Sequence, residues 1–296
     1  MAKLGLIFSG QGAQHPGMGA LLYQSSNAAR RLFDEADAIL GWNLTRLCFD
    51  GPQEELTACA RCQPAIYTVS LAAWAARQEN PPEDETACVA GGLSLGELAA
   101  CTAAGVWDFA TGLKVVAERG RLMDAECQRT QGAMAAVLGA EPARVAEIAA
   151  AHGIDVANYN CPGQLIVSGE AELLRQACAE LSPEAMKIVP LEVAGAYHSR
   201  LMRPAGEKFR HFLEGVPLQS PALPLVHNVT GEFAAPEPMN LRDRLAEQVY
   251  SPVRWEQCCR ILMQHCEKLL ELGPGQVLTG LARRIDRRFP TEATAL

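Results

Sequence analysis

The segment GLSLG at residues 92–96 places Ser94 between two glycines at the G-x-S-x-G spacing. An apolar run precedes it and helix-favouring residues follow it, which predicts a strand, a sharp turn and a helix. In a nucleophile elbow of this kind the strained turn lifts the serine hydroxyl clear of the sheet, and the glycines let neighbouring backbone approach. The N–H of Leu95 then points to where an oxyanion would form. The motif favours a catalytic Ser94 over the alternative, a glycine-rich turn without chemistry.

A second glycine-rich loop follows the first predicted strand. Residues 4–8 are a continuous apolar run, typical of a strand buried on both faces of a parallel sheet. The next residues, SGQGAQ at 9–14, are rich in glycine, which indicates backbone that approaches another group closely. This segment alone leaves a polar site containing Gln11 and a flexible turn equally open.

Residues 132–190 have the pattern of a compact unit in which strands and helices alternate. Strands are predicted over 133–138, 154–159, 164–168 and 186–190, and helices over 142–151 and 170–181. The order β-α-β-β-α-β is that of the ferredoxin-like fold. We therefore expect a ferredoxin-like subdomain over residues 131–194, inserted into a larger α/β subdomain formed by residues 1–130 and 195–296.

The larger part of the chain alternates helical and extended patterns, which predicts an α/β fold with a parallel sheet. Helices are predicted over 28–40, 64–77, 203–214, 241–249 and 255–265, with strands over 224–229 and 268–272 and a last helix ending at 284.

Two further polar residues stand at places where their function is open. Arg119 lies in a helix capped by Asp108, close to apolar positions, where an arginine is usually a surface residue. His198 lies at a glycine- and alanine-rich junction before a helix, where helix capping and catalysis are both open.

The charge and the terminal segments exclude several classes of function. A formal charge of -8 argues against nucleic acid as a partner, because phosphate binding needs clustered Lys and Arg. The short basic cluster at 283–288 is expected on a solvated helix face. The N-terminus lacks the features of a signal peptide, and no apolar run is long enough to span a bilayer. We therefore expect a cytoplasmic protein that does not bind membranes.

The chain has eleven cysteines, which in the cytoplasm are expected to be reduced. Cys59 and Cys62 have the C-x-x-C spacing, but no second pair lies at the distance of a zinc site. A metal or redox function is the less favoured interpretation, and no metal site is expected.

Eight separated segments together resemble the malonyl-CoA:acyl carrier protein transacylases, the FabD-like acyltransferases. Each segment is common alone, but their order and spacing are specific and cover nearly the whole chain. They are FSGQG at 8–12, GLSLGE at 92–97, ERGRLM at 118–123, GAMAAV at 132–137, NYNCPGQ at 158–164, GAYHS at 195–199, SPVRW at 251–255 and ELGPG at 271–275. The resemblance implies an α/β-hydrolase-like large subdomain, a ferredoxin-like small subdomain and an active site between them.

The resemblance also implies a Ser-His dyad. Ser94 would attack the thioester of malonyl-CoA and form a malonyl-serine ester, with His198 as the general base. A backbone carbonyl near Gln248, in place of a carboxylate, would orient the imidazole. The N–H groups of Gln11 and Leu95 would hold the oxyanion.

Four residues are implied in substrate binding. Arg119 matches the arginine that pairs with the free carboxylate of the malonyl group, for which a bidentate guanidinium is suited. Tyr197 stands where phenylalanine is more usual, and Leu93 stands where the family most often has histidine. Asn160 completes the set.

The implied partners are malonyl-CoA and an acyl carrier protein whose phosphopantetheine thiol accepts the malonyl group. No cofactor is implied, and we expect a monomer that functions in fatty acid biosynthesis. Because Leu93 also occurs in relatives that load malonyl onto the carrier subunit of malonate decarboxylase, that function is an alternative, as is a trans-acting acyltransferase of a polyketide synthase. An inactive scaffold that docks a carrier protein and a serine hydrolase are further alternatives.

Overall fold

The computed structural model describes residues 1–235 and 237–294 and contains two four-stranded sheets. In the first part of the chain the elements are β1 Ala2–Phe8, α1 Ala20–Ser25, α2 Asn27–Leu40, α3 Leu44–Asp50, α4 Gln53–Thr57, α5 Cys59–Glu79, β2 Glu85–Gly92, α6 Leu95–Ala103 and α7 Phe109–Cys127. Next come β3 Gly132–Leu138, α8 Pro142–Ala151, β4 Asp155–Cys161, β5 Gln164–Glu170, α9 Ala171–Leu181 and β6 Lys187–Pro190. The remainder contains a 3-10 turn at Arg200–Met202, α10 Arg203–Glu214, α11 Pro238–Gln248, α12 Trp255–His265, β7 Lys268–Leu272, α13 Val277–Ile285 and β8 Thr291–Ala293.

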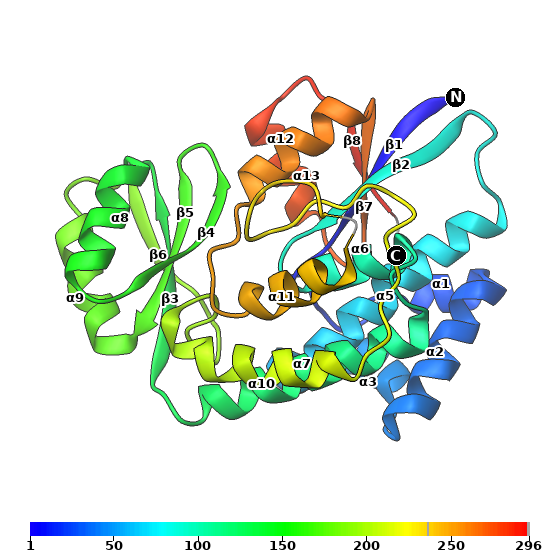
Figure 1. Cartoon of the computed structure of the whole chain (residues 1–296), viewed down its shortest axis with the longest axis horizontal. Helices are drawn as coiled ribbons and strands as arrows, with labels where there is room; N and C mark the ends of the chain where they lie inside the picture. The colour runs from blue at the N-terminus through cyan, green and yellow to red at the C-terminus, as the bar shows by residue number, and fades with distance from the viewer. Residues whose placement is uncertain (236, 295–296) are drawn as a thin grey trace.

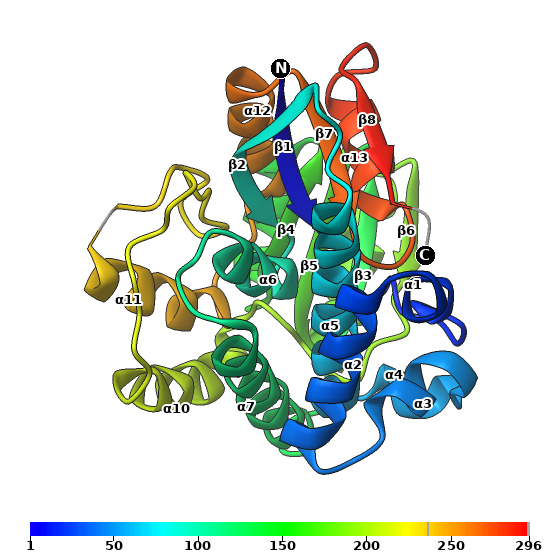
Figure 2. The ribbon, with the colours of Figure 1, turned by 90° about the vertical axis from the view of Figure 1, so that its right-hand side faces the viewer.

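The first sheet is parallel, with the strand order β2-β1-β7-β8 (Figure 2). β1 is buried on both faces from Leu4 to Phe8, as its continuous apolar run predicts. Leu6 and Phe8 belong to the core that includes α5, whereas Ile7 faces the core formed with α12 and α13. Because β1 and β2 are neighbours and run in the same direction, the segments that follow Phe8 and Gly92 leave the sheet at the same edge.

The second sheet is antiparallel, with the order β4-β5-β3-β6, and α8 and α9 pack on it (Figure 1). The predicted order of strands and helices is thus confirmed, and so is the α/β fold class with a separate ferredoxin-like unit. The two regions touch where β4 meets the segment before α12: Tyr159 N–H donates to the Val253 carbonyl at 2.9 Å, and Val253 N–H donates to the Ala157 carbonyl at 2.8 Å. The expected boundaries at 131 and 194 stay predictions.

One predicted strand is wrong, and several short elements were not predicted. Residues 224–229 make single bridges, to Ala90 and Phe233, instead of a strand. Pro224 has no N–H to donate, and the side chain of Asn228 is bound to the turn after β2. The short elements α1, α3, α4 and β8 carry too few residues for a periodic pattern.

None of the described helices combines the length and the apolar character that crossing a membrane requires.

Candidate active site

Ser94 lies in the turn between β2 and α6, with a backbone φ of 52°. Within residues 1–235 and 237–294, His198 is the one other non-glycine residue with positive φ, at 55°. The glycines of the motif are required by crowding. A Cβ on Gly92 would lie 2.1 Å from the Gly96 carbonyl carbon, and one on Gly96 would lie 2.0 Å from the Phe8 oxygen. Backbone strain is therefore concentrated at the serine and the histidine, as it is at many active sites.

Asn228 holds the turn from both sides. Its side-chain oxygen accepts from the Ser94 N–H at 2.6 Å, and its amide nitrogen donates to the Gly92 carbonyl at 2.8 Å. The amide is fully buried, so these bonds fix the strained turn without competition from water.

His198 joins Ser94 to the end of α11. Its Nε2 lies 2.7 Å from Ser94 Oγ, and its Nδ1 lies 2.8 Å from the backbone oxygen of Gln248. A carbonyl oxygen can only accept, so Nδ1 carries the proton and Nε2 is free to accept the serine proton. Burial and the nearby Arg119 cation lower the pKa of His198 to about 4. The imidazole is therefore neutral at pH 7, the state that a general base needs.

Arg119 is buried, with 1% of its surface exposed, so the surface position that its helix pattern favoured is wrong. Its Nη2 donates to Ser94 Oγ at 3.1 Å and to Gln248 Oε1 at 2.9 Å, and its Nη1 donates to Gln63 Oε1 at 2.8 Å. Burial lowers the pKa of Arg119 to about 10, which leaves the guanidinium charged at pH 7. A cation and a serine with a neutral histidine beside it thus share one hydrogen-bonded cluster.

Gln11 and Leu95 lie on the two loops that leave β1 and β2 at the same sheet edge. A Cβ on Gly10 would lie 2.6 Å from the Leu93 oxygen, so the loop that carries Gln11 packs directly on the serine turn. Leu95 is the first residue of α6, where a backbone N–H has no partner within the helix. The Gln11 loop and the start of α6 are therefore adjacent beside Ser94.

Tyr197 is buried beside His198, next to the cysteine pair. The Cys59 thiol lies 3.1 Å from the Tyr197 hydroxyl and 3.4 Å from Gln11 Oε1. The hydrogen bond to Cys59 and burial raise the pKa of Cys62 well above its usual value, so that side chain remains a thiol. The part of the chain that the structure describes has no group of three or more His, Cys, Asp or Glu side chains that could hold a metal ion. The two cysteines pack under the tyrosine and the Gln11 loop.

Leu93 and Asn160 lie outside the hydrogen-bonded cluster of Ser94, His198 and Arg119. Leu93 is half-buried and packs against Gly10. Asn160 lies on β4 with a buried Oδ1 that has no hydrogen-bond partner. No hydrogen bond joins these two described side chains to Ser94, His198 or Arg119.

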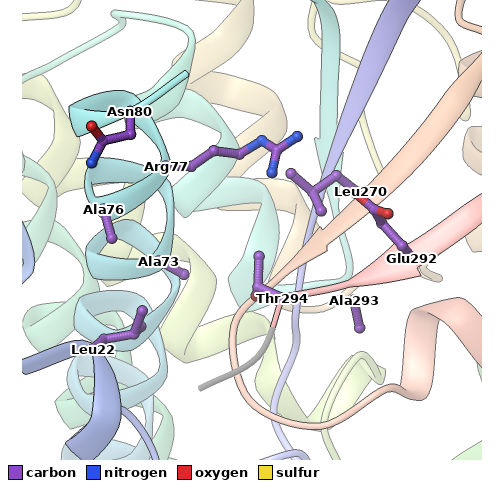
Figure 3. A pocket seen from close by; sticks show the side chains of 9 residues that line it. All are labelled: Leu22, Ala73, Ala76, Arg77, Asn80, Leu270, Glu292, Ala293 and Thr294. Atoms are coloured by element: carbon purple, nitrogen blue, oxygen red, sulfur yellow. The ribbon is translucent and has the colours of Figure 1, made fainter. Parts of the chain in front are cut away.

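A pocket of about 390 Å³ lies elsewhere, between α1 and α5 on one side and β7 and β8 on the other (Figure 3). Two of its charged lining residues already have ion-pair partners, Arg77 with Glu85 and Glu292 with Lys268. Because none of the predicted site residues lines it, the pocket is not the candidate active site.

Three residues of the cluster were not predicted from the sequence: Gln63, Glu97 and Asn228. Glu97 was quoted in the motif without a function, although its place three residues after Ser94 puts it in the first turn of α6. Gln63 directly follows the C-x-x-C segment, and Asn228 lay in the stretch wrongly expected to be a strand. No local pattern identifies the last two.

The chain is similar to known acyltransferases over nearly its whole length. Residues 6–270 match the family model described as the acyl transferase domain. The chain is 38% identical, over its whole length and 94% of the relative, to a protein of Bacillus subtilis named malonyl CoA-acyl carrier protein transacylase.

Two solved structures are similar over 99% of the chain, each with a TM-score of 0.94. One, 35% identical and covered over 97% of its length, is an acyl carrier protein S-malonyltransferase from Vibrio cholerae. The other, 33% identical and covered over 96%, is a malonyl-transacylase in complex with its type II polyketide synthase acyl-carrier protein.

Proposed function

Because the chain belongs to the malonyl-CoA:acyl carrier protein transacylase family, we propose that it moves the malonyl group of malonyl-CoA to an acyl carrier protein in fatty acid biosynthesis. The observation that supports this most is the 3.1 Å contact between Arg119 Nη2 and Ser94 Oγ. It sets a buried cation beside a serine that also bonds to a neutral histidine. A carboxylate and a thioester carbonyl of one small acyl group can then be bound together.

In the first half-reaction Ser94 Oγ attacks the thioester carbon as His198 Nε2 takes the serine proton. The negative charge that develops on the carbonyl oxygen is stabilised by the N–H groups of Gln11 and Leu95. When the tetrahedral intermediate collapses, the carbon–sulfur bond breaks and His198 returns the proton to the sulfur of coenzyme A. The product is a malonyl ester on Ser94.

The backbone oxygen of Gln248 keeps His198 in the tautomer that this step requires. It accepts from Nδ1 at 2.8 Å, so Nε2 is left as the base. A neutral carbonyl orients the ring without adding a charge, consistent with an imidazole whose pKa stays low.

The second half-reaction is the reverse chemistry with a new thiol. The phosphopantetheine thiol of the carrier protein gives its proton to His198 and attacks the ester carbon. The carbon–oxygen bond to Ser94 breaks, and the serine regains its proton from His198. The malonyl group leaves as a thioester of the carrier, and the enzyme returns to its starting state.

Arg119 selects malonyl over uncharged acyl groups in this proposal. A malonyl carboxylate would form a charge-assisted pair with the guanidinium, whose partners in the structure are neutral oxygens. Tyr197, Leu93 and Asn160 are proposed to line the path of the acyl group and its carrier arm. Asn160 is a fitting candidate because its buried Oδ1 has no partner.

The carrier and the pathway have alternatives. The similarity to a malonyl-transacylase bound to a polyketide synthase carrier favours a trans-acting polyketide acyltransferase as the second candidate. Because Leu93 precedes the nucleophile, loading of a malonate decarboxylase carrier is a further alternative. An inactive docking scaffold is disfavoured because it has no need of an intact Ser94–His198–Arg119 cluster.

The test is covalent labelling. The purified protein, incubated with malonyl-CoA labelled in the malonyl group, is expected to carry the label on Ser94 in a peptide map. Ser94→Ala is expected to lower labelling by about 10⁴-fold or more, since removal of a nucleophile eliminates most of the catalysis. An unlabelled wild-type protein would rule out the transferase.

The labelled enzyme is then offered equal amounts of holo-carriers of the fatty acid, polyketide and malonate decarboxylase types. We expect the fatty acid carrier to be loaded fastest. Faster loading of either other carrier assigns the protein to that pathway, and release of malonate to water in place of carrier loading indicates a hydrolase.

A further inference from the structure

Glu97 is a buried carboxylate directly behind the catalytic cluster, with 1% of its surface exposed. It accepts three hydrogen bonds: from His227 Nδ1 at 2.6 Å, from the Asn228 N–H at 3.2 Å and from Gln248 Nε2 at 2.6 Å. It also lies in the first turn of α6, where the helix dipole favours an anion. Three hydrogen bonds therefore fix the position of this carboxyl group, and the mechanism above gives it no function.

The bond to Glu97 fixes which way the Gln248 amide points. Its Nε2 donates to Glu97 and to the Ser94 carbonyl, at 2.6 and 2.8 Å, and its Oε1 accepts from Arg119 Nη2 at 2.9 Å. Turned over, the amide would set its oxygen against the carboxylate and its N–H groups against the guanidinium. A single orientation of the Gln248 amide therefore satisfies all three partners.

Glu97 is consequently linked to Arg119 through the Gln248 amide and makes no direct hydrogen bond to it. Its hydrogen-bond partners are the neutral oxygens of Gln63, Gln248 and Ser94, and no Asp or Glu in the described chain forms an ion pair with it. Its Nε is buried without a partner. A carboxylate in direct contact with Arg119 would compete with the substrate carboxylate. Glu97 avoids this competition because the Gln248 side-chain amide lies between it and Arg119.

We infer that Glu97 is a positioning residue for malonyl selectivity: it locks the Gln248 amide so that a neutral oxygen faces Arg119 and the guanidinium stays charged and open to the substrate. This inference rests on the proposed function, because it gives Glu97 its effect through the binding of a malonyl carboxylate. Gln248 thus serves twice, with its backbone oxygen on His198 and its side chain on Arg119.

The test compares Ser94 labelling by malonyl-CoA and by acetyl-CoA in single-turnover experiments. In Glu97→Gln the new amide lets the Gln248 amide turn over and present N–H groups to Arg119. We expect the malonyl-to-acetyl ratio to fall about tenfold, the factor that losing one charge-assisted hydrogen bond implies.

An exchange variant sharpens the experiment. Glu97→Gln combined with Gln248→Glu keeps one amide and one carboxylate in the pair but places the carboxylate on Arg119. The loss of the Gln248 Nε2 hydrogen bond to the Ser94 carbonyl lowers both labelling rates, so the ratio is the readout. We expect the malonyl-to-acetyl ratio to fall about a hundredfold, because the guanidinium is then already paired. The backbone oxygen that orients His198 is unchanged in this variant.

A matched control is Glu271→Gln, which neutralises another fully buried carboxylate. Glu271 accepts from the N–H groups of Leu278 and Thr279 at the start of α13 and from the Ser9 hydroxyl, and it makes no hydrogen bond to Ser94 or Arg119. Its loss is expected to leave the acyl ratio unchanged. Thermal midpoints of all variants report folding separately from selectivity.

The decisive comparison is made in the Arg119→Ala variant. Adding Glu97→Gln to it should not change the malonyl-to-acetyl ratio any further. The inference is overturned if Glu97→Gln lowers malonyl and acetyl labelling equally, or if its effect on the ratio persists without Arg119. If the wild type loads no malonyl group, the proposed function fails and this inference fails with it. If the wild type loads normally and the ratio is unmoved, the inference alone fails.

Discussion

The two sheet regions differ in where they hold charge. Around the parallel sheet, Glu97, Arg119 and Glu271 are buried almost completely. In residues 132–190, none of the buried side chains that the structure describes carries a charge, and the core is formed by apolar residues of β3 to β6, α8 and α9. Charges of that region lie outside, for example Arg144 with Glu184 at 3.0 Å.

The difference shows what each region contributes. Burying a charged side chain costs desolvation free energy. Such a side chain is therefore found where hydrogen bonds offset that cost and where the charge contributes to binding or catalysis. In the parallel-sheet region the compensation is a connected set of amides and carbonyls around Ser94. The antiparallel region follows the ordinary rule of an apolar core and a charged surface.

Removal of the buried Arg119 cation is expected to have the largest effect on activity. In Arg119→Ala we expect malonyl labelling of Ser94 to fall about 10²- to 10³-fold, the range expected when a buried charge pair is lost. Acetyl labelling should fall by less than about tenfold, because an acetyl group has no carboxylate to pair. Rates from both acyl-CoA donors measure the ratio, and equal losses would show that Arg119 is structural.

The same cation should set the pH dependence of the site. Burial and Arg119 lower the pKa of His198 to about 4, and protonated His198 cannot take the serine proton. Acetyl labelling should therefore be flat near neutral pH and fall about tenfold per unit below the pKa. In Arg119→Ala the repulsion is gone, the pKa of His198 rises, and the decline should begin at higher pH. If the decline in acetyl labelling at low pH began at the same pH in Arg119→Ala as in the wild type, Arg119 would not influence the pKa of His198.

The smallest effect is expected for a charge of the other region. Arg144 is partly exposed at the surface and lies within 2.8, 3.5 and 3.0 Å of three glutamates, Glu147, Glu180 and Glu184. Solvent screens such pairs, so Arg144→Ala should leave malonyl labelling unchanged and shift the thermal midpoint by no more than about 2 °C. A large loss of activity would mean that surface charges of the antiparallel region contribute to the reaction or to carrier binding.

Local patterns predicted much of this fold. The apolar run of β1 and the alternation of strands and helices over residues 132–190 depend on near neighbours in the chain. The spacing of the glycines marks the serine turn, although Gly96 is required by its contact with the distant Phe8. The stretch 224–229 was wrongly predicted to be a strand. An apolar run does not show whether a neighbouring strand is available for continuous backbone hydrogen bonding.

The G-x-S-x-G spacing after an apolar run was enough to predict a serine at a strained turn after a buried strand, because such a turn needs glycines around the nucleophile. The groups that surround the serine became known from the folded structure. Arg119 is buried because other segments cover its helix face, and the Glu97 and Gln248 side chains meet across 151 positions of sequence. Periodicity records which face of an element is apolar, whereas contacts between distant polar groups depend on how the packed elements bring those faces together.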